Sequence, residues 1–385
     1  MENFNSISFL KLRASYGLIG NAEIGNFDSQ SLFEGNTYGE ETGTEPETVS
    51  NPDLKWETTR QFDIGVDMGF LRDRISFTVD YYNKDTRDLL LNVQVPSTTG
   101  FTTQTKNLGR LTNQGIEFSI NSQNFVGAFK WSTNFNISRN VNEIKDLNGQ
   151  ILAPGNRSRI LNEAREGEPI GVLFGVKFAG VDPANGDALY FTEEGTTTNN
   201  YSAAARQVIG DPNPAFIGGL TNNFGYKGFD LSIFLQFVVG NDVYNMAGGF
   251  MSASADFFDN QTVDQLRRWQ NPGDITDVPQ ARLFEQNGAR ISSRYVEDGS
   301  YLRFKTVTLG YNVPAGILSK IKMRSARLYV TGQNLFTITD YSGWDPEVTS
   351  LFTSTDFQSS NIIIGNDFYT PPQARTIIFG INVGF

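Results

Sequence analysis

The stretch that decides the fold is QFDIGVDMGFLRDRISFTVDY, residues 61–81. In its first half apolar side chains alternate with Gln, Asp and Gly, and in its second half they alternate with Ser, Thr and Asp. Such period-two alternation predicts β-strands with one apolar and one polar face. Residues 70–73 between the two halves are few enough for a hairpin turn. We therefore predict an antiparallel pair of strands over about 56–69 and 74–87.

The same alternation recurs along the chain and predicts eight further strands. These cover about 7–18, 110–122, 127–140, 214–226, 228–240, 300–312, 323–336 and 376–385. Links of two lengths alternate between successive strands: short ones at 70–73, 123–126, 227 and 313–322, and long ones such as 19–55, 141–213 and 241–299. Short turns at one rim and long loops at the other are typical of outer-membrane β-barrels.

The polar face of these strands supports the same fold class. Asp63 and Asp67 alternate with apolar residues, and an unpaired carboxylate is costly in a sandwich core but acceptable in a wet barrel interior. Aromatic residues near the turns fit the interfacial girdle of a barrel. They are Phe125, Phe129, Tyr226, Phe229, Tyr311 and Phe385. The alternative, a soluble β-sandwich or propeller, does not explain long loops confined to one rim.

Composition excludes several classes of function. The chain has 385 residues, no Cys and no His, so disulfides, thiol nucleophiles, Ser-His-Asp catalysis and the common zinc sites are excluded. A net charge of −11 argues against nucleic-acid binding. No apolar run reaches the roughly 20 residues of a membrane-spanning helix. We expect no enzyme activity, no catalytic or metal-binding residues and no cofactor.

Several longer segments are similar to a known family. In the first half they are LKLRASYGLIGN (10–21), NPDLKWETTRQFDIGVDMGFL (51–71), RISFTVDYYNKDTRDLL (74–90) and NLGRLTNQGIEFSI (107–120). In the second half they are GEPIGVLFGVKFAGVDPANGDALYF (167–191), GDPNPAFIGGLTNNFGYKGFDLSIFLQ (210–236), DGSYLRFKTVTLGYNVP (298–314) and RLYVTGQNLFTITDYSGWDPEV (327–348). Together they resemble the C-terminal barrel portion of the SusC/RagA family of TonB-linked outer-membrane proteins of the Bacteroidetes.

The resemblance implies more than the periodicity does. Family members are barrels of about 22 strands with an N-terminal plug and a TonB-box. They work with a SusD-like surface lipoprotein as a lid and with TonB, ExbB and ExbD, and they import oligosaccharides or peptides. By this resemblance residues 1–385 are a single domain, about the last ten strands of such a barrel, located in the outer membrane. Residues 1–18 show no signal peptide, so we expect a fragment without plug or earlier strands.

Few residues stand out as functional candidates. Trp269, Tyr341 and Trp344 lie in long loops, where their rings either stack on a ligand such as a sugar or pack within the loops. The terminal Phe385 resembles the signal read by the barrel-assembly machinery. Residues 182–187, DPANGD, are either a calcium loop or a plain turn. The acidic run of Glu40, Glu41, Glu45 and Glu47 is either a solvated loop or a contact with the lid or an ion.

Three functions compete at this point. The leading one is the barrel of a SusC/SusD-type nutrient importer, in contact with outer-membrane lipid and a glycan or peptide substrate. A secreted or surface β-rich carbohydrate-binding module also fits loop aromatics and low helix content. A receptor barrel for siderophores or cobalamin is the third.

Overall fold

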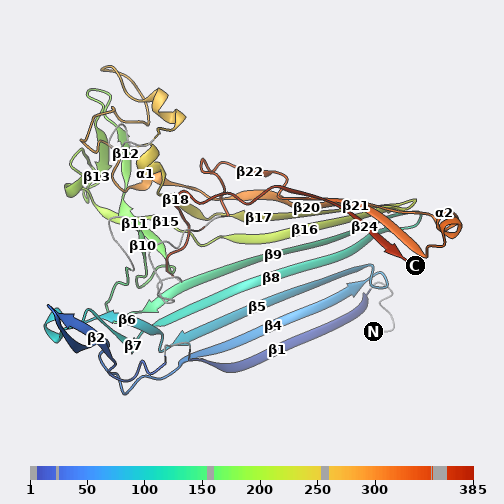
Figure 1. Ribbon diagram of the computed structural model, residues 1–385, viewed down its shortest axis with the longest axis horizontal. Coiled ribbons are helices and arrows are strands. Elements are labelled where there is room, and N and C mark those ends of the chain that lie inside the picture. Colours follow the sequence, from blue (N-terminus) through green and yellow to red (C-terminus); the bar gives the residue numbers. More distant parts are fainter. Residues whose placement is uncertain (1–6, 23–25, 154–159, 253–259, 348, 350–361) are drawn as a thin grey trace.

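The computed structural model describes residues 7–22, 26–153, 160–252, 260–347, 349 and 362–385. Its main feature is one antiparallel sheet, which we call the wall (Figure 1). Its strands are β1 (Ile7–Asn21), β4 (Glu57–Phe70), β5 (Ile75–Arg87), β8 (Arg110–Val126), β9 (Phe129–Asp146), β16 (Phe216–Tyr226), β17 (Phe229–Val239), β20 (Tyr301–Asn312), β21 (Ser325–Gln333) and β24 (Thr376–Gly384). They pair in chain order, and β22 (Thr337–Thr339) pairs with β20.

All ten predicted strands are confirmed, and the largest differences in their bounds concern β8 and β9. β8 runs to Val126 and β9 runs to Asp146, so the turn between them is 127–128 rather than 123–126. β9 also extends six residues beyond the predicted end at 140. These extensions carry mostly polar side chains, and backbone pairing continues through them because a ladder needs no apolar face.

The wall has the two faces that the alternation predicts. Leu12, Val66 and Val79 lie in register on one face, on which Leu12 is 74% exposed and Phe62 and Ile64 are exposed as well. Five of the six predicted girdle aromatics are also exposed: Phe125, Phe129, Tyr226, Phe229 and Phe385. The other face carries Arg13, Asp67 and Asp80. A sheet that exposes its apolar face requires lipid, not water, on that side.

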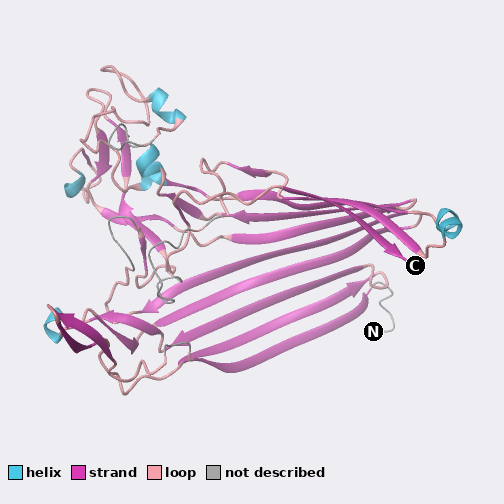
Figure 2. Ribbon diagram, in the orientation of Figure 1, coloured by secondary structure: helices cyan, strands magenta, loops and turns pink. Residues whose placement is uncertain are grey.

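The wall also has two different rims. One rim carries the short turns, and its longest connection holds α2 (Ala315–Leu318) and η5 (Ser319–Ile321). At the other rim lie the hairpin of β2 (Phe33–Tyr38) and β3 (Glu41–Pro46) and that of β6 (Leu90–Gln94) and β7 (Thr103–Asn107), with η1 (Ser97–Thr99). Figure 2 shows these loops gathered at the end away from both termini. We call this end the loop rim.

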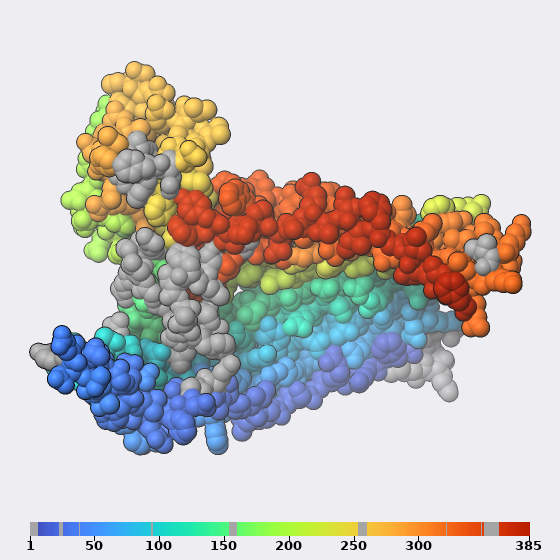
Figure 3. Space-filling view, in the orientation of Figure 1, coloured from blue at the N-terminus to red at the C-terminus, as the bar shows by residue number. Residues whose placement is uncertain are grey.

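The three long loops after β9, β17 and β21 form a second body, which we call the canopy. Its small sheets are β10 (Asn162–Glu163), β11 (Val172–Val176) and β15 (Arg206–Gly210); β12 (Phe178–Val181), β13 (Ala188–Phe191) and β14 (Thr197–Thr198); and β18 (Asp242–Asn245), β19 (Val296–Asp298) and β23 (Asn366–Asp367). Its helices are α1 (Gly248–Met251), η2 (Tyr201–Ala203), η3 (Val263–Arg267) and η4 (Ser293–Tyr295). Figure 3 shows it as a lobe standing on the loop rim.

Most of the buried apolar residues belong to the canopy. Leu161, Leu173, Tyr244, Met246 and Tyr295 form one cluster, with Phe368 packed against it. These residues come from all three long loops, so the loops share a core and hold one another in place. No described helix is long and apolar enough to cross a bilayer.

Candidate functional site

The polar face of the wall is tied together by ion pairs that cross three strands. Arg13 on β1 donates to Asp67 on β4 at 2.9 Å and pairs with Asp80 on β5 at 2.8 Å. Its guanidinium passes over Gly65, where an added Cβ would lie 2.1 Å from an Asp80 oxygen. A side chain at this position would push Asp80 and the Arg13 guanidinium aside, so glycine lets the arginine reach the third strand.

Other glycines on this face are covered in the same way. Arg327 on β21 pairs with Asp230 on β17 across Gly310 of β20. Tyr82 lies over Gly115 and donates to Asn140 Oδ1 at 2.8 Å, two strands away. These contacts pair charged and polar groups of this face with partners one or two strands away.

A buried arginine joins the wall to the loop after β21. Arg303 on β20 is 2% exposed and pairs with Asp345 and Glu347. Lys305 also binds Glu347, at 2.7 Å. Because a buried guanidinium without carboxylates would be very costly, these pairs fix the start of this loop against the wall. Sequence reasoning missed the cluster, since its partners lie about 40 residues apart.

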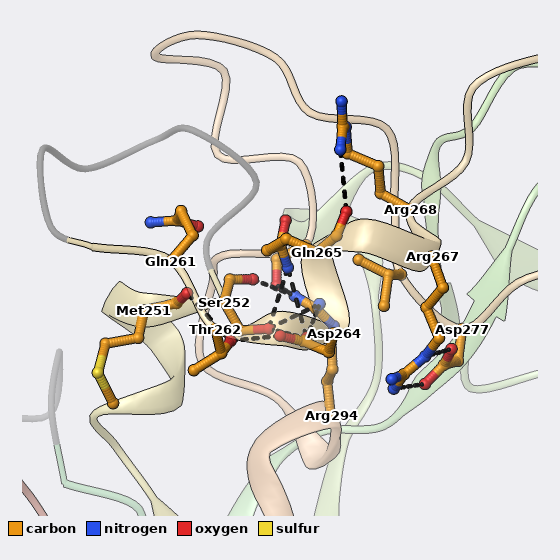
Figure 4. A network of polar contacts seen from close by, with 12 residues as sticks. Met251, Ser252, Gln261, Thr262, Asp264, Gln265, Arg267, Arg268, Asp277 and Arg294 are labelled. Atoms are coloured by element: carbon orange, nitrogen blue, oxygen red, sulfur yellow. Dashed lines mark hydrogen bonds and ion pairs between the residues drawn. The ribbon is translucent and has the colours of Figure 1, made fainter.

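The canopy contains a cavity of about 700 Å³. Asp264, Arg267, Asp277, Arg294 and Trp344 are among its lining residues. Figure 4 shows the polar network beside it: Asp264 accepts hydrogen bonds from Ser252 and Thr262, and the forked guanidinium of Arg267 donates twice to Asp277, at 2.8 Å each. Arg294 holds the network to the canopy through the Ser252 and Gly288 carbonyls, at 2.9 and 3.0 Å.

The network keeps its carboxylates ionised. Burial opposes ionisation of Asp264, but the hydrogen bonds from Ser252 and Thr262 and the charge of Arg294 outweigh it and hold its pKa below the ordinary value. The pKa of Asp277 is lowered chiefly by the hydrogen bonds from Arg267. The cavity therefore combines charged and polar groups with apolar ones, and the exposed rings of Trp344 and Tyr369 are among its lining residues.

The three candidate loop aromatics have different environments. Trp269 is 5% exposed, and its Nε1 donates to the Pro183 carbonyl at 3.0 Å. Tyr341 is also 5% exposed, and its hydroxyl donates to Asp367 Oδ2 at 2.8 Å; burial and the nearby Asp367 raise its pKa. Trp344 is 64% exposed and lines the cavity. Of the three, only Trp344 has an exposed ring.

The remaining candidates are placed as follows. In the 182–187 segment, Gly186 has a φ of 76°. Asp187 binds Asn185, Asn199 and Arg282, so its oxygens are occupied within the chain. No group of three or more His, Cys, Asp or Glu able to hold a metal occurs in the described part of the chain.

The acidic run, Glu40, Glu41, Glu45 and Glu47, lies exposed on and beside the β2–β3 hairpin. Phe385 follows β24 directly and is 79% exposed.

The wall has an apolar outer face and a polar inner face, with short turns at one rim and long loops at the other. This combination defines an outer-membrane β-barrel protein. The family model described as "TonB dependent receptor-like, beta-barrel" matches residues 3–335. The chain belongs to this family, and within it to the SusC/RagA type, whose members lie in the outer membrane. This placement contradicts the alternative of a secreted module.

The similarity to relatives extends over the full length of this chain. TonB-dependent receptor P3 of Formosa agariphila is 38% identical over 100% of this chain and 40% of its own length. TonB-dependent receptor SusC of Bacteroides thetaiotaomicron is 30% identical over 100% of this chain and 38% of its own. The solved RagAB peptide transporter matches with a TM-score of 0.85 and 27% identity, over 100% of this chain and 42% of that one. The chain thus spans about 40% of the length of these relatives.

Proposed function

We propose that the receptor containing this chain imports oligosaccharides or peptides across the outer membrane. A SusD-like lipoprotein at the loop rim would be its partner, and TonB, ExbB and ExbD would supply the energy. The observation that carries this proposal is the match to RagAB, a peptide transporter, over 100% of this chain with the canopy included. Residues 1–385 would then be one barrel segment, closed by strands from the rest of the receptor.

We propose that Trp344 contacts the substrate at the canopy cavity. Its ring is exposed beside the Arg267–Asp277 pair, which offers both donors and acceptors to a sugar hydroxyl or a peptide bond. Trp56 is equally exposed, at 64%, but does not line the cavity, so it is a matched control. Trp344→Ala should lower import about two- to tenfold, the range expected for one aromatic contact, and Trp56→Ala should not.

The experiment compares uptake of labelled oligosaccharide and peptide mixtures by cells carrying the complete receptor or either variant. TonB-dependent uptake of one mixture, reduced by Trp344→Ala, supports the proposal and identifies the substrate class. Uptake of neither mixture, with uptake of an iron chelate or cobalamin instead, would favour the siderophore or cobalamin type of receptor.

We also propose that Phe385 is a signal for the barrel-assembly machinery. Its side chain is 79% exposed directly after β24, and Phe379 on that strand is about as exposed, at 80%. Phe385→Ala should reduce the amount of receptor assembled in the outer membrane more than Phe379→Ala does. Equal losses would mean that both residues act only through contact with lipid.

A further inference from the structure

Three arginines meet on the outer face of the wall at the loop rim. They are Arg60 near the start of β4, Arg87 at the end of β5 and Arg110 at the start of β8. Arg60 lies opposite Asp85 in the register, and Arg87 lies opposite Arg110. We call this group, with Asp85, the arginine rim.

The side chains of the arginine rim point away from the polar face. Arg60 shares a face of β4 with the exposed apolar residues Phe62 and Ile64. Arg87 shares a face with Tyr81, and Arg110 shares it with Ile116, because the β5–β8 pairing is regular from Arg87 to Tyr81. The arginines therefore lie on the side of the wall that contacts lipid, where charges are costly unless they reach the interface.

The charges of the arginine rim are not balanced within the described residues. Arg110 Nε donates to Asp85 Oδ1 at 2.6 Å, and Arg87 Nη2 pairs with Asp85 Oδ2 at 3.0 Å. One carboxylate thus serves two guanidinium groups that are still 43% and 44% exposed. Arg60 has no ion pair or side-chain hydrogen bond to any described residue, and like charges directly opposite across strands are unfavourable.

Neighbouring acidic groups supply only part of the missing charge. Asp88 is paired with Lys55 at 3.0 Å and Glu143 is paired with Lys145. Asp146, opposite Arg110 on β9, accepts from the Asn148 amide at 2.7 Å and keeps its charge, so three arginines face two carboxylates, Asp85 and Asp146. This local excess of positive charge occurs in a chain whose net charge is −11. A ligand with negative charge is the simplest complement.

The position of the arginine rim identifies the class of ligand. Two residues beyond Arg60 and Asp85, and four beyond Arg87 and Arg110, the same face carries Phe62, Asn83 and Gln114. Two residues further along each strand it carries Ile64, Tyr81 and Ile116. Each step of two residues is about 7 Å, so the charged groups lie at the loop-rim end of this face and the apolar groups lie further toward the middle of the strands, where hydrocarbon is expected. Guanidinium groups bind phosphate with paired hydrogen bonds.

We propose that the arginine rim binds a phosphate-bearing lipid headgroup of the outer leaflet. Asp85 holds Arg87 and Arg110 in position, Arg60 completes the set, and the acyl chains lie along Ile64, Tyr81 and Ile116. The proposal depends on the placement of the chain in the outer membrane and not on the imported substrate, so it stands apart from the proposed function.

The test measures binding of lipid A to the complete receptor, purified in detergent and stripped of lipid. Arg60→Gln should weaken binding about fivefold, and the triple variant of Arg60, Arg87 and Arg110 to Gln should weaken it about 100-fold, at roughly a factor of five for each cation. The matched control changes the exposed Arg72, Lys227 and Lys320 to Gln, which removes the same charge from the opposite rim. The control should bind lipid A as the unchanged receptor does.

Two further probes make the outcome decisive. Dephosphorylated lipid A should bind as weakly to the unchanged receptor as lipid A does to the triple variant. Inorganic phosphate at millimolar concentration should compete poorly, because it lacks the acyl chains. Any of three results would overturn the proposal: equal binding of both lipid forms, full competition by free phosphate, or unchanged binding by Arg60→Gln. This last substitution breaks no ion pair or side-chain hydrogen bond to a described residue, so it should leave folding intact.

Discussion

The wall exposes its apolar side chains, whereas the canopy buries them. On the wall Leu12 is 74% exposed and Phe379 is 80% exposed, while in the canopy Leu173 is fully buried and Tyr244 is 2% exposed. The wall therefore depends on lipid to cover its apolar face, and the canopy has a core like that of a water-soluble domain. Substitutions in one body should leave the other largely intact.

The largest expected effect is in the canopy core. Leu173→Ala should cost about 2–5 kcal/mol, because it leaves a cavity among residues from three loops. Limited proteolysis of intact outer membranes should then cut the canopy faster, while the heat-modifiable mobility of the barrel on gels stays the same. Leu309→Ala, on the exposed face of β20, is the control and should not change canopy proteolysis. Loss of heat-modifiability in Leu173→Ala would show that the two bodies are coupled.

The next effect concerns the lipid face of the wall. The register places Ile233 beside Val307 and Leu220 beside Leu235 on one face, with Ser232 on the other. Ile233→Arg should cost about 2–4 kcal/mol in the free energy of unfolding in a bilayer, and Ser232→Arg should cost far less. Urea titration of the receptor in lipid vesicles measures both. Similar losses at the two positions would contradict the assignment of faces.

A smaller effect should separate two glycines of the polar face. Gly65→Ala should cost about 1–3 kcal/mol, because the new methyl group displaces Arg13 from Asp80. Gly17 is on the same face and has nothing within 4 Å of an added Cβ, so Gly17→Ala should change stability little. The same urea titration serves here. If the two variants behave alike, the ion pairs over Gly65 do not constrain that position.

The sequence predicted the two bodies unequally. All ten long strands of the wall were found, since alternation is a local signal and lipid requires it to be regular, but the short β22 was not. The canopy core was not found, because Leu173, Tyr244 and Tyr295 are far apart in the chain and follow no period. For the same reason the sequence could not tell the buried Trp269 and Tyr341 from the exposed Trp344. Distant contacts decide the environment of each ring.

The smallest expected effect is the pH response of the canopy. The pKa of Asp264 lies below its ordinary value of 3.8, so the stability that its ionised form contributes is present above that pH. It is lost as the pH falls through the pKa of the folded state. Canopy proteolysis by an acid-active protease, followed between about pH 5 and pH 2, should therefore accelerate at the acid end.

Asp264→Asn should weaken the canopy by about 1 kcal/mol at neutral pH and reduce this acid response, because the charge that Arg294 and the hydroxyl groups favour is gone. Asp277 also has a lowered pKa, but its side chain is 65% exposed against 23% for Asp264. Solvent screens an exposed pair, so Asp277→Asn should leave the acid response nearly unchanged. If Asp277→Asn reduced the acid response more than Asp264→Asn does, the exposed Arg267–Asp277 pair would stabilise the canopy more than the Ser252–Asp264–Arg294 network.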